Sequence, residues 1–211
     1  MSKMNSKHMR ENPLFMRNRY KGTGRWGIPL VRKQGLPERE FKWLACSNAR
    51  KIETRNASSI GIHFFVDDYR FEGVYNHPEK TLDKYLQYGV LLTPDFSTYS
   101  EMQPWRQLES VAKNRWCGAY WQDNAKDSIV IPTVSWSTPI NYEFCFEGVE
   151  EHSIVAISTI GCKHSPREFM HGYDAMIDRL SPELIICVGK PFAKMKGNIY
   201  IVDDELARKA R

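Results

Sequence analysis

The stretch that decides the fold runs from Ile60 to Trp136 and contains three apolar runs that end abruptly in polar residues. The runs are Ile60-Gly-Ile-His-Phe-Phe-Val-Asp-Asp68, Gly89-Val-Leu-Leu-Thr-Pro-Asp-Phe-Ser97 and Ser128-Ile-Val-Ile-Pro-Thr-Val-Ser-Trp136. Short, continuous runs of β-branched and aromatic residues are typical of strands buried on both faces. Since ligands of parallel α/β sheets bind beyond the carboxyl ends of the strands, the polar residues are predicted to face one site.

Strand-like and helix-like segments alternate along the chain. Strands are expected at residues 27–31, 60–66, 90–93, 128–134, 153–159, 184–188 and 198–202, and helices at residues 38–48, 78–88, 104–116 and 167–180. Residues 118–122 either continue a helix or form a further short strand. This alternation predicts an α/β fold with a mostly parallel sheet and right-handed crossovers.

Two architectures fit this alternation. Seven strands favour a TIM-barrel-like fold, incomplete or minimal because the 211 residues lie near the lower limit of about 200 residues for that fold. An open doubly wound sheet is the alternative. No GxGxxG follows a strand, which removes the usual dinucleotide-binding fingerprint.

Charge is distributed unevenly along the chain. Residues 1–55 contain fourteen Lys or Arg and four Asp or Glu, giving +10, so the remainder carries −5 of the total of +5. We expect residues 1–25 to form a basic flexible arm and residues 26–211 a single α/β domain. Arg17, Arg19, Lys21 and Arg25 are candidates for binding nucleic acid, and a solvated arm without a partner is the alternative.

Composition limits the cellular location and the cysteine chemistry that we expect. No run of about 18 apolar residues exists, and residues 1–10 lack the apolar segment of a secretory signal, so we expect a cytoplasmic protein with no membrane partner. The five cysteines are odd in number, widely spaced and contain no CxxC, which disfavours a zinc ribbon or a disulfide framework. Cys162, beside Lys163 and His164, is a candidate nucleophile without an identifiable partner.

The candidate catalytic residues are the carboxylates at two strand ends, Asp67, Asp68 and Asp95. Adjacent strand residues point to opposite faces, so Asp67 and Asp68 are not expected to act as a simple pair. Two carboxylates from neighbouring strand ends can share a proton, bind a divalent metal, or act as acid and nucleophile. Aspartates are also common turn and helix starters, which is the structural alternative.

Candidate substrate-binding residues follow the same strand-end rule. Hydroxyl, amide, indole and ammonium groups there can bond to and stack on a base or sugar, or meet a phosphate. The candidates are Ser97, Gln122, Thr133, Ser135, Trp136, Ser158, Thr159 and Lys190. Local bonding at turns, core packing and a solvated lysine are the competing interpretations.

Several of these segments together resemble a known family. They are His63-Phe-Phe-Val-Asp-Asp-Tyr-Arg-Phe71, Pro94-Asp-Phe-Ser97, Ala119-Tyr-Trp-Gln122, Pro132-Thr-Val-Ser-Trp136, Val155-Ala-Ile-Ser-Thr-Ile-Gly161 and Gly189-Lys190. In this order they look like the uncharacterised family called domain of unknown function 4417, over roughly residues 27–190. The resemblance implies a phage or mobile-element context, and it supplies no reaction, cofactor or catalytic residue.

The sequence favours an enzyme that acts on a nucleotide, nucleoside or nucleic acid through strand-end carboxylates. Its chemistry would be hydrolase or glycosyl-transfer type, by acid/base or metal-assisted catalysis, with a divalent metal as the candidate cofactor. The alternative is a non-catalytic protein that binds nucleic acid, a nucleotide signal or a host protein. Clustered carboxylates favour the enzyme, and the lack of a complete catalytic signature favours the binding protein.

Overall fold

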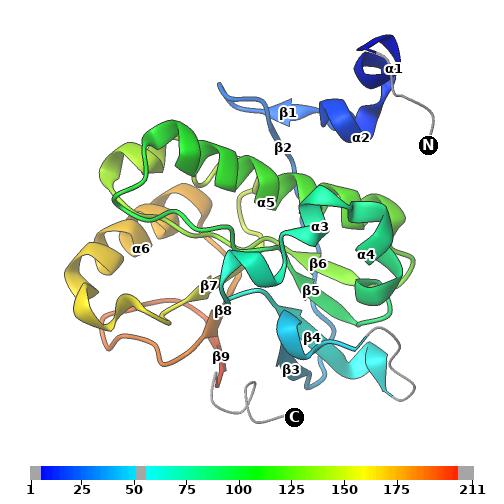
Figure 1. The fold of residues 1–211 in the computed structure, drawn as a ribbon. Helices are drawn as coiled ribbons and strands as arrows, with labels where there is room; N and C mark the ends of the chain where they lie inside the picture. Colours follow the sequence, from blue (N-terminus) through cyan, green and yellow to red (C-terminus); the bar gives the residue numbers. More distant parts are fainter. Residues whose placement is uncertain (1–5, 51–55, 204–211) are drawn as a thin grey trace.

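The computed structural model describes residues 6–50 and 56–203 as a mixed α/β fold (Figure 1). Two parallel sheets form its centre. The first contains β3 (Lys42–Ala45), β4 (Ile60–His63), β5 (Val90–Leu92) and β6 (Ile129–Ile131) in that order. The second contains β7 (Ile154–Ser158), β8 (Leu184–Val188) and β9 (Ile199–Val202).

The strands follow one another in space as they do in sequence. Every described pairing within the two sheets is parallel, for example Ile62 with Leu91 and Ala156 with Ile186. A single parallel bridge, Thr133 with Ala156, connects the sheets. The prediction of neighbouring parallel strands is therefore confirmed, whereas the prediction of one continuous sheet is replaced by two sheets joined at a bridge.

Helices connect the strands and cover their outer faces. They are α3 (Gly73–Asn76), α4 (Pro78–Tyr85), α5 (Pro104–Asn124) and α6 (Pro166–Leu180). Helices α4, α5 and α6 all begin with proline, whose fixed φ and missing N–H suit a first helical turn. Residues 118–122 continue α5. Figure 1 shows α5 and α6 along one side of the strands, with β3 and β9 at the far edges.

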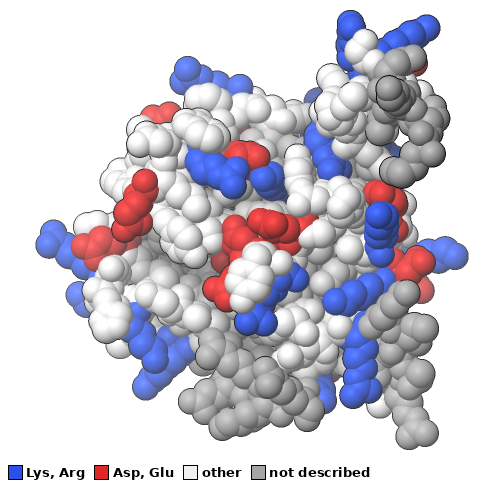
Figure 2. Space-filling view, viewed as in Figure 1, with Lys and Arg blue, Asp and Glu red and all other residues white. Residues whose placement is uncertain are grey.

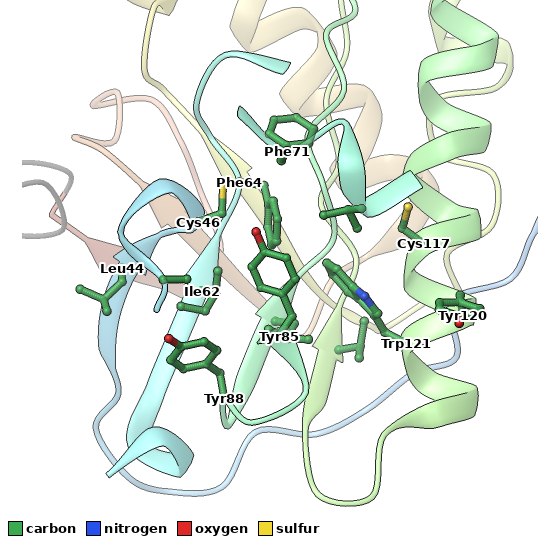
Figure 3. Close-up of a cluster of buried hydrophobic side chains, with 14 of the residues drawn as sticks. Leu44, Cys46, Ile62, Phe64, Phe71, Tyr85, Tyr88, Cys117, Tyr120 and Trp121 are labelled. Carbon is green, nitrogen blue, oxygen red and sulfur yellow. The ribbon is translucent and has the colours of Figure 1, made fainter. Parts of the chain in front are cut away.

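Three hydrophobic clusters fix these layers. The first packs α3, α4 and α5 on the first sheet, and Figure 3 shows Tyr85 and Trp121 beside Phe64 and Ile62. The second packs α6 on the second sheet through side chains such as Met176. The third lies on the opposite faces and takes residues from both sheets, among them Leu92, Ile131, Ala156 and Ile186. Both sheets therefore curve around one shared interior.

Closure of this interior into a barrel is not observed. The rings of Trp43 on β3 and Tyr200 on β9 lie 6.4 Å apart between centroids. No hydrogen-bonded pairing joins β3 to β9 in the part of the chain that the structure describes. The described fold is therefore α/β with two parallel sheets.

Near the N-terminal end, one sequence prediction is wrong and another is confirmed in part. Residues 38–48 were expected to be helical, but Lys42–Ala45 form β3. Trp43, Leu44 and Ala45 are all buried, which suits a strand between two layers better than a one-sided helix. Residues 27–31 were expected to be an edge strand, but only β2 (Ile28–Pro29) forms, in an antiparallel pair with β1 (Gly22–Thr23).

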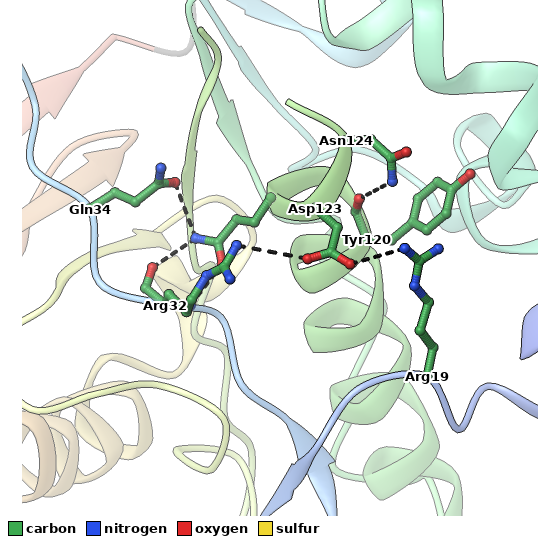
Figure 4. A network of polar contacts seen from close by, with 7 residues as sticks. Arg19, Arg32, Gln34, Tyr120, Asp123 and Asn124 are labelled. Carbon is green, nitrogen blue, oxygen red and sulfur yellow. Dashed lines mark hydrogen bonds and ion pairs between the residues drawn. The ribbon is translucent and has the colours of Figure 1, made fainter. Parts of the chain in front are cut away.

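The N-terminal segment contains α1 (Ser6–Glu11) and α2 (Pro13–Met16) and is attached to the body. The guanidinium of Arg17 stacks on Tyr75 and Trp116, 4.2 and 4.0 Å from the ring centroids. Arg19 forms an ion pair of 3.3 Å with Asp123 on α5, and Arg32 approaches the same carboxylate (Figure 4). These contacts attach the described part of the segment to the body, and the basic flexible arm over residues 1–25 stays a prediction.

Candidate functional site

A cavity of about 660 Å³ opens at the carboxyl ends of the strands. It is lined by residues that follow β3, β4, β5, β6 and β7, so both sheets contribute to it. The predicted site residues in its lining are Asp67, Asp95, Ser97, Ser135, Trp136 and Ser158. This position is the one that the strand-end rule predicts for a ligand site.

Asp67 and Asp68 have different surroundings, because the chain turns into a 3₁₀ helix (Asp68–Arg70) at this point. Asp67 is exposed at the mouth, where its Oδ2 lies 3.5 Å from Nε of Arg70. The carboxylate of Asp68 accepts hydrogen bonds from the hydroxyl of Ser97 at 2.8 Å and from its backbone N–H. Asp68 therefore ties the end of β4 to the loop that follows β5, beside Asp95.

Asp95 is the most perturbed acid of the site. Burial, with a smaller contribution from the charge of Asp68, raises its pKa to about 7 against the opposing effects of a Ser135 hydrogen bond and Arg115. Its Oδ1 is buried without a hydrogen-bond partner. An unpaired, desolvated oxygen disfavours the charged form. Asp95 is thus balanced between acid and base near neutral pH.

A buried polar network holds the strand ends around Asp95. The side chain of Asn114 on α5 accepts from the hydroxyl of Thr93 at 2.7 Å and donates to the carbonyl of Pro94 at 2.8 Å. Arg115 donates to the carbonyl of Thr133 at 2.6 Å and to two further carbonyls, those of Cys145 and Glu147. Asn114 and Arg115 therefore fix the segments that lead to Asp95 and Ser135.

Arg115 is fully buried, and burial lowers its pKa to about 10 while the Asp95 and Cys145 groups oppose that change. Its hydrogen bonds all go to neutral oxygens, one of them the Asn114 amide oxygen at 2.6 Å. Asn114 and Arg115 were not predicted from the sequence, because polar residues in a helix usually indicate its solvent-facing side. Trp105 on the same helix is exposed.

Aromatic side chains form one wall of the cavity. The indole N–H of Trp136 donates to the carbonyl of Phe169 at 3.1 Å, and their rings lie 5.0 Å apart between centroids. Gly172 on α6 leaves room for the indole, because a Cβ there would meet Trp136 at 2.0 Å. Phe65 and Tyr99 also line the cavity. A planar ligand would find rigid apolar surfaces here.

Four predicted substrate-binding residues lie outside the lining. Gln122 bonds to the backbone of Arg32 through both ends of its amide. Thr133 and Thr159 are buried in the framework, and Lys190 is exposed beyond β8. Ser158 does line the cavity, but its hydroxyl is engaged with the carbonyl of Val188 and the N–H of Ile160. Fewer of the predicted substrate-binding residues therefore face the cavity than the sequence suggested.

The four predicted nucleic-acid-binding residues are not equivalent. Arg17 and Arg19 contact the body as described, whereas Lys21 and Arg25 are exposed. The guanidinium of Arg25 stacks on the exposed Trp26, 4.9 Å from its ring centroid. Figure 2 shows acidic side chains near the middle of the face presented in Figure 1, with basic side chains beside them.

Metal-binding and thiol chemistry have little support at this cavity. Among residues 6–50 and 56–203, no group of three or more His, Cys, Asp or Glu is placed to hold a metal ion. Cys162 lines the cavity, where burial and the charge of Asp95 raise its pKa, so the thiol is not activated. None of the helices in this described part is long and apolar enough to span a membrane.

Comparisons with known proteins place this fold in a phage context. The family model of a domain of unknown function, DUF4417, matches residues 20–205. The Gene 1 protein of Mycobacterium phage L5 is 45% identical over 181 residues, covering 84% of this chain and 77% of that protein. The Gene 1 protein of Mycobacterium phage D29 is 40% identical over 181 residues, covering 84% of this chain and 65% of that protein. No solved structure matches the chain significantly.

Proposed function

For this chain, which belongs to the DUF4417 family of phage proteins, we propose an enzymatic function on a nucleotide, nucleoside or nucleic acid. Asp95 is the general acid and base, and Asp68 is its ionised neighbour. The observation that carries this proposal is a carboxyl of pKa about 7 that lines a strand-end cavity beside a second carboxylate. Groups that titrate near the working pH transfer protons most effectively.

The division of roles follows from the surroundings of the two acids. The hydrogen bonds from Ser97 hold the Asp68 carboxylate in a fixed position beside Asp95. Asp95, buried beside that charge, keeps a proton that it can donate to a leaving group and recover from water. Ser135 and Trp136 position the substrate, and glycosyl transfer or hydrolysis is the class of reaction that two such carboxyls serve.

We further propose an architecture, a cellular location and a candidate cofactor for this protein. The shared interior of the two sheets makes the fold an incomplete, TIM-barrel-like one, open between β3 and β9. The protein works in the cytoplasm, where nucleotides are available. A divalent metal bound to Asp68 or Asp95 through one or two carboxylate contacts remains a candidate cofactor, because Mg²⁺ keeps most of its water ligands in such sites.

The test is turnover of a substrate panel. Nucleosides, nucleotides and short oligonucleotides are incubated with the protein, with and without Mg²⁺, and the products are separated by chromatography. We expect cleavage or transfer that Asp95→Asn lowers by at least about 100-fold, within the range for loss of a general acid. The charge-matched control Asp127→Asn, an exposed residue before β6, should retain activity. Turnover that survives Asp95→Asn would refute the assigned role.

The second candidate is a non-catalytic binding protein for nucleic acid, a nucleotide signal or a host protein. The exposed rings of Tyr69, Tyr99 and Trp105 favour it, since exposed aromatics stack on bases and bury in interfaces. Binding of a panel member without any product would select this candidate over the enzyme.

Nucleic-acid binding through the N-terminal region has its own test. Lys21 and Arg25 lie within the matched family region and are exposed beside Trp26. If they contact phosphates, the affinity for DNA or RNA should fall steeply as salt rises, and Lys21→Ala/Arg25→Ala should flatten that dependence. Lys126→Ala/Lys194→Ala, which removes two exposed lysines elsewhere, is the control. An unchanged salt slope in the first variant would exclude this contact.

A further inference from the structure

The charges at the cavity are unbalanced. Asp95 lines it and Asp68 lies directly behind Ser97, whereas the cation in the described lining is Arg70. Arg70 stands at the mouth, half exposed, and is already paired with Asp67. The acids of the interior therefore face no unpaired cation among the residues that line the cavity.

Arg115 does not change this balance for a ligand. It is 1% exposed, and its donors are occupied by the oxygens of Asn114, Thr133, Cys145 and Glu147. Reaching the cavity would leave the carbonyls of Cys145 and Glu147 unpaired, which is unfavourable because a polar group without water needs a hydrogen-bond partner. Arg115 acts on Asp95 from behind and offers no contact to a phosphate.

The remaining lining suits an uncharged ring. Trp136, Phe65 and Phe169 supply apolar surfaces, and Ser135 and Thr98 supply hydroxyls. The indole of Trp136 is held by its hydrogen bond to Phe169 and by close packing on Gly172. A volume of about 660 Å³ lies within the range of cavities that hold small molecules.

We propose that this cavity binds the uncharged base or nucleoside part of its ligand and excludes the phosphate groups. The proposal rests on the proposed function and specifies which part of the substrate is recognised. With no metal bound, a phosphate inside would meet the Asp68 carboxylate and the buried oxygen of Asp95 without a compensating cation from the described lining, and like charges in a desolvated site repel strongly. A neutral heterocycle meets no such repulsion, and it can hydrogen-bond to the Asp95 carboxyl and Ser135.

The test compares ligands that share a base and sugar and differ in the number of phosphate groups. Isothermal titration at low salt measures adenosine, guanosine, cytidine and uridine against their 5′-monophosphates and 5′-triphosphates. We expect at least one nucleoside to bind, and its triphosphate to bind at least about tenfold more weakly. Higher salt should narrow that difference, because screening weakens the repulsion.

Variants identify the source of the discrimination. Asp68→Asn keeps an acceptor for Ser97 and removes the charge, so it should reduce the nucleoside-to-triphosphate ratio at least threefold. Asp127→Asn, which removes an exposed acid at the other end of β6, should leave the ratio unchanged. A thermal melt of each variant confirms folding before titration.

The outcomes separate this inference from the proposed function. A triphosphate that binds more tightly than its nucleoside, with binding still dependent on Asp95, would overturn the inference and leave the proposed function standing. Absence of binding by every nucleoside and nucleotide would overturn the inference and leave nucleic acid as the substrate on which the proposed function depends. Equal affinities across each series would also overturn the inference, because they would place the phosphates outside any influence of the carboxylates.

Discussion

At the residue scale, the chemistry of this molecule depends on where one carboxyl oxygen lies. Oδ1 of Asp95 is buried without a partner, while the neighbouring Asp68 has both Ser97 donors. Two neighbouring aspartates thus have different surroundings, and the burial of Asp95 favours its neutral form. The burial that suits Asp95 to its proposed role therefore lowers the free energy of unfolding at neutral pH.

This cost predicts a pH-dependent effect of Asp95→Asn. The folded-state pKa of about 7 exceeds the ordinary aspartate pKa of 3.8, so the folded protein binds more protons than the unfolded chain between these pH values. The wild type therefore loses stability as pH rises from about 4 to 7, and Asn should remove this loss. The variant should be neutral or slightly less stable at pH 4.5, and more stable by about 1–3 kcal/mol at pH 8. Urea unfolding at both pH values measures the difference in free energy of unfolding between the variant and the wild type. A variant less stable than the wild type at pH 8 would contradict the interpretation of Asp95 as a buried acid.

Arg115 provides the second residue-scale prediction. Replacing it with methionine leaves the carbonyls of Cys145 and Glu147 without donors and that of Thr133 with the Asn114 amide alone, which should lower the free energy of unfolding by about 3 kcal/mol. Loss of its charge should also raise the pKa of Asp95 and move any pH–activity profile upward. Arg106→Met on the same helix, where the exposed side chain pairs with Glu109, should change stability by less than about 0.5 kcal/mol. Similar losses in the two variants would contradict a special role for Arg115.

The positions of the carboxylates could be predicted from the sequence, whereas the position of Arg115 could not. Asp67, Asp68 and Asp95 follow apolar runs, so topology alone places them at one sheet edge. Asn114 and Arg115 carry no such signal, because their partners are backbone carbonyls such as those of Pro94 and Thr133, far away in sequence. Likewise the amide of Gln122 is used by Arg32, which no local pattern indicates.

At the scale of elements, α6 shapes the cavity through the glycine at its centre. Gly172 allows the helix to lie directly against Trp136, whose N–H reaches the carbonyl of Phe169 one turn earlier. Periodicity predicted this helix well, since Phe169, Tyr173 and Met176 recur on one face and all are buried. It could not predict β3, because strand pairing with β4 overrides the helical spacing around Leu44.

Gly172→Ala should therefore damage both stability and binding. Alanine favours a helix over glycine by about 1 kcal/mol, but its Cβ would displace the indole of Trp136 at a cost of about 1–3 kcal/mol. A net loss of stability with weaker ligand binding is expected, measured by thermal melts and titration. Gly73→Ala on α3 has open space around the new Cβ, with Thr81 nearest at 3.9 Å, so it should be neutral or stabilising. A stabilised Gly172→Ala would show that the indole does not depend on this contact.

At the scale of the whole molecule, the two ends of the described chain, the N-terminal segment and β9, lie at the edges of the fold (Figure 1). The alternation of strands and helices predicted the parallel order, whereas the single bridge between the sheets depends on how β6 and β7 meet at Thr133 and Ala156. The N-terminal segment crosses from α2 to the helical layer, and neither α1 nor α2 contributes a buried residue of its own. Its attachment must come from the residues that follow.

Arg17 is the attachment point with the most contacts, and its replacement tests how the segment is held. The guanidinium lies between the rings of Tyr75 and Trp116, and Nη2 donates to the carbonyl of Tyr75 at 2.5 Å. Cation–π contacts of a desolvated arginine contribute up to about 2 kcal/mol, so Arg17→Ala should lower the unfolding free energy by about 1–2 kcal/mol and speed proteolysis near residues 6–16. Arg19→Ala removes a more exposed ion pair with Asp123 and should cost less than about 0.5 kcal/mol, with little change in cleavage. If both variants were cleaved at the wild-type rate, the segment would be held by Leu14 and Tyr20 packing on the core instead.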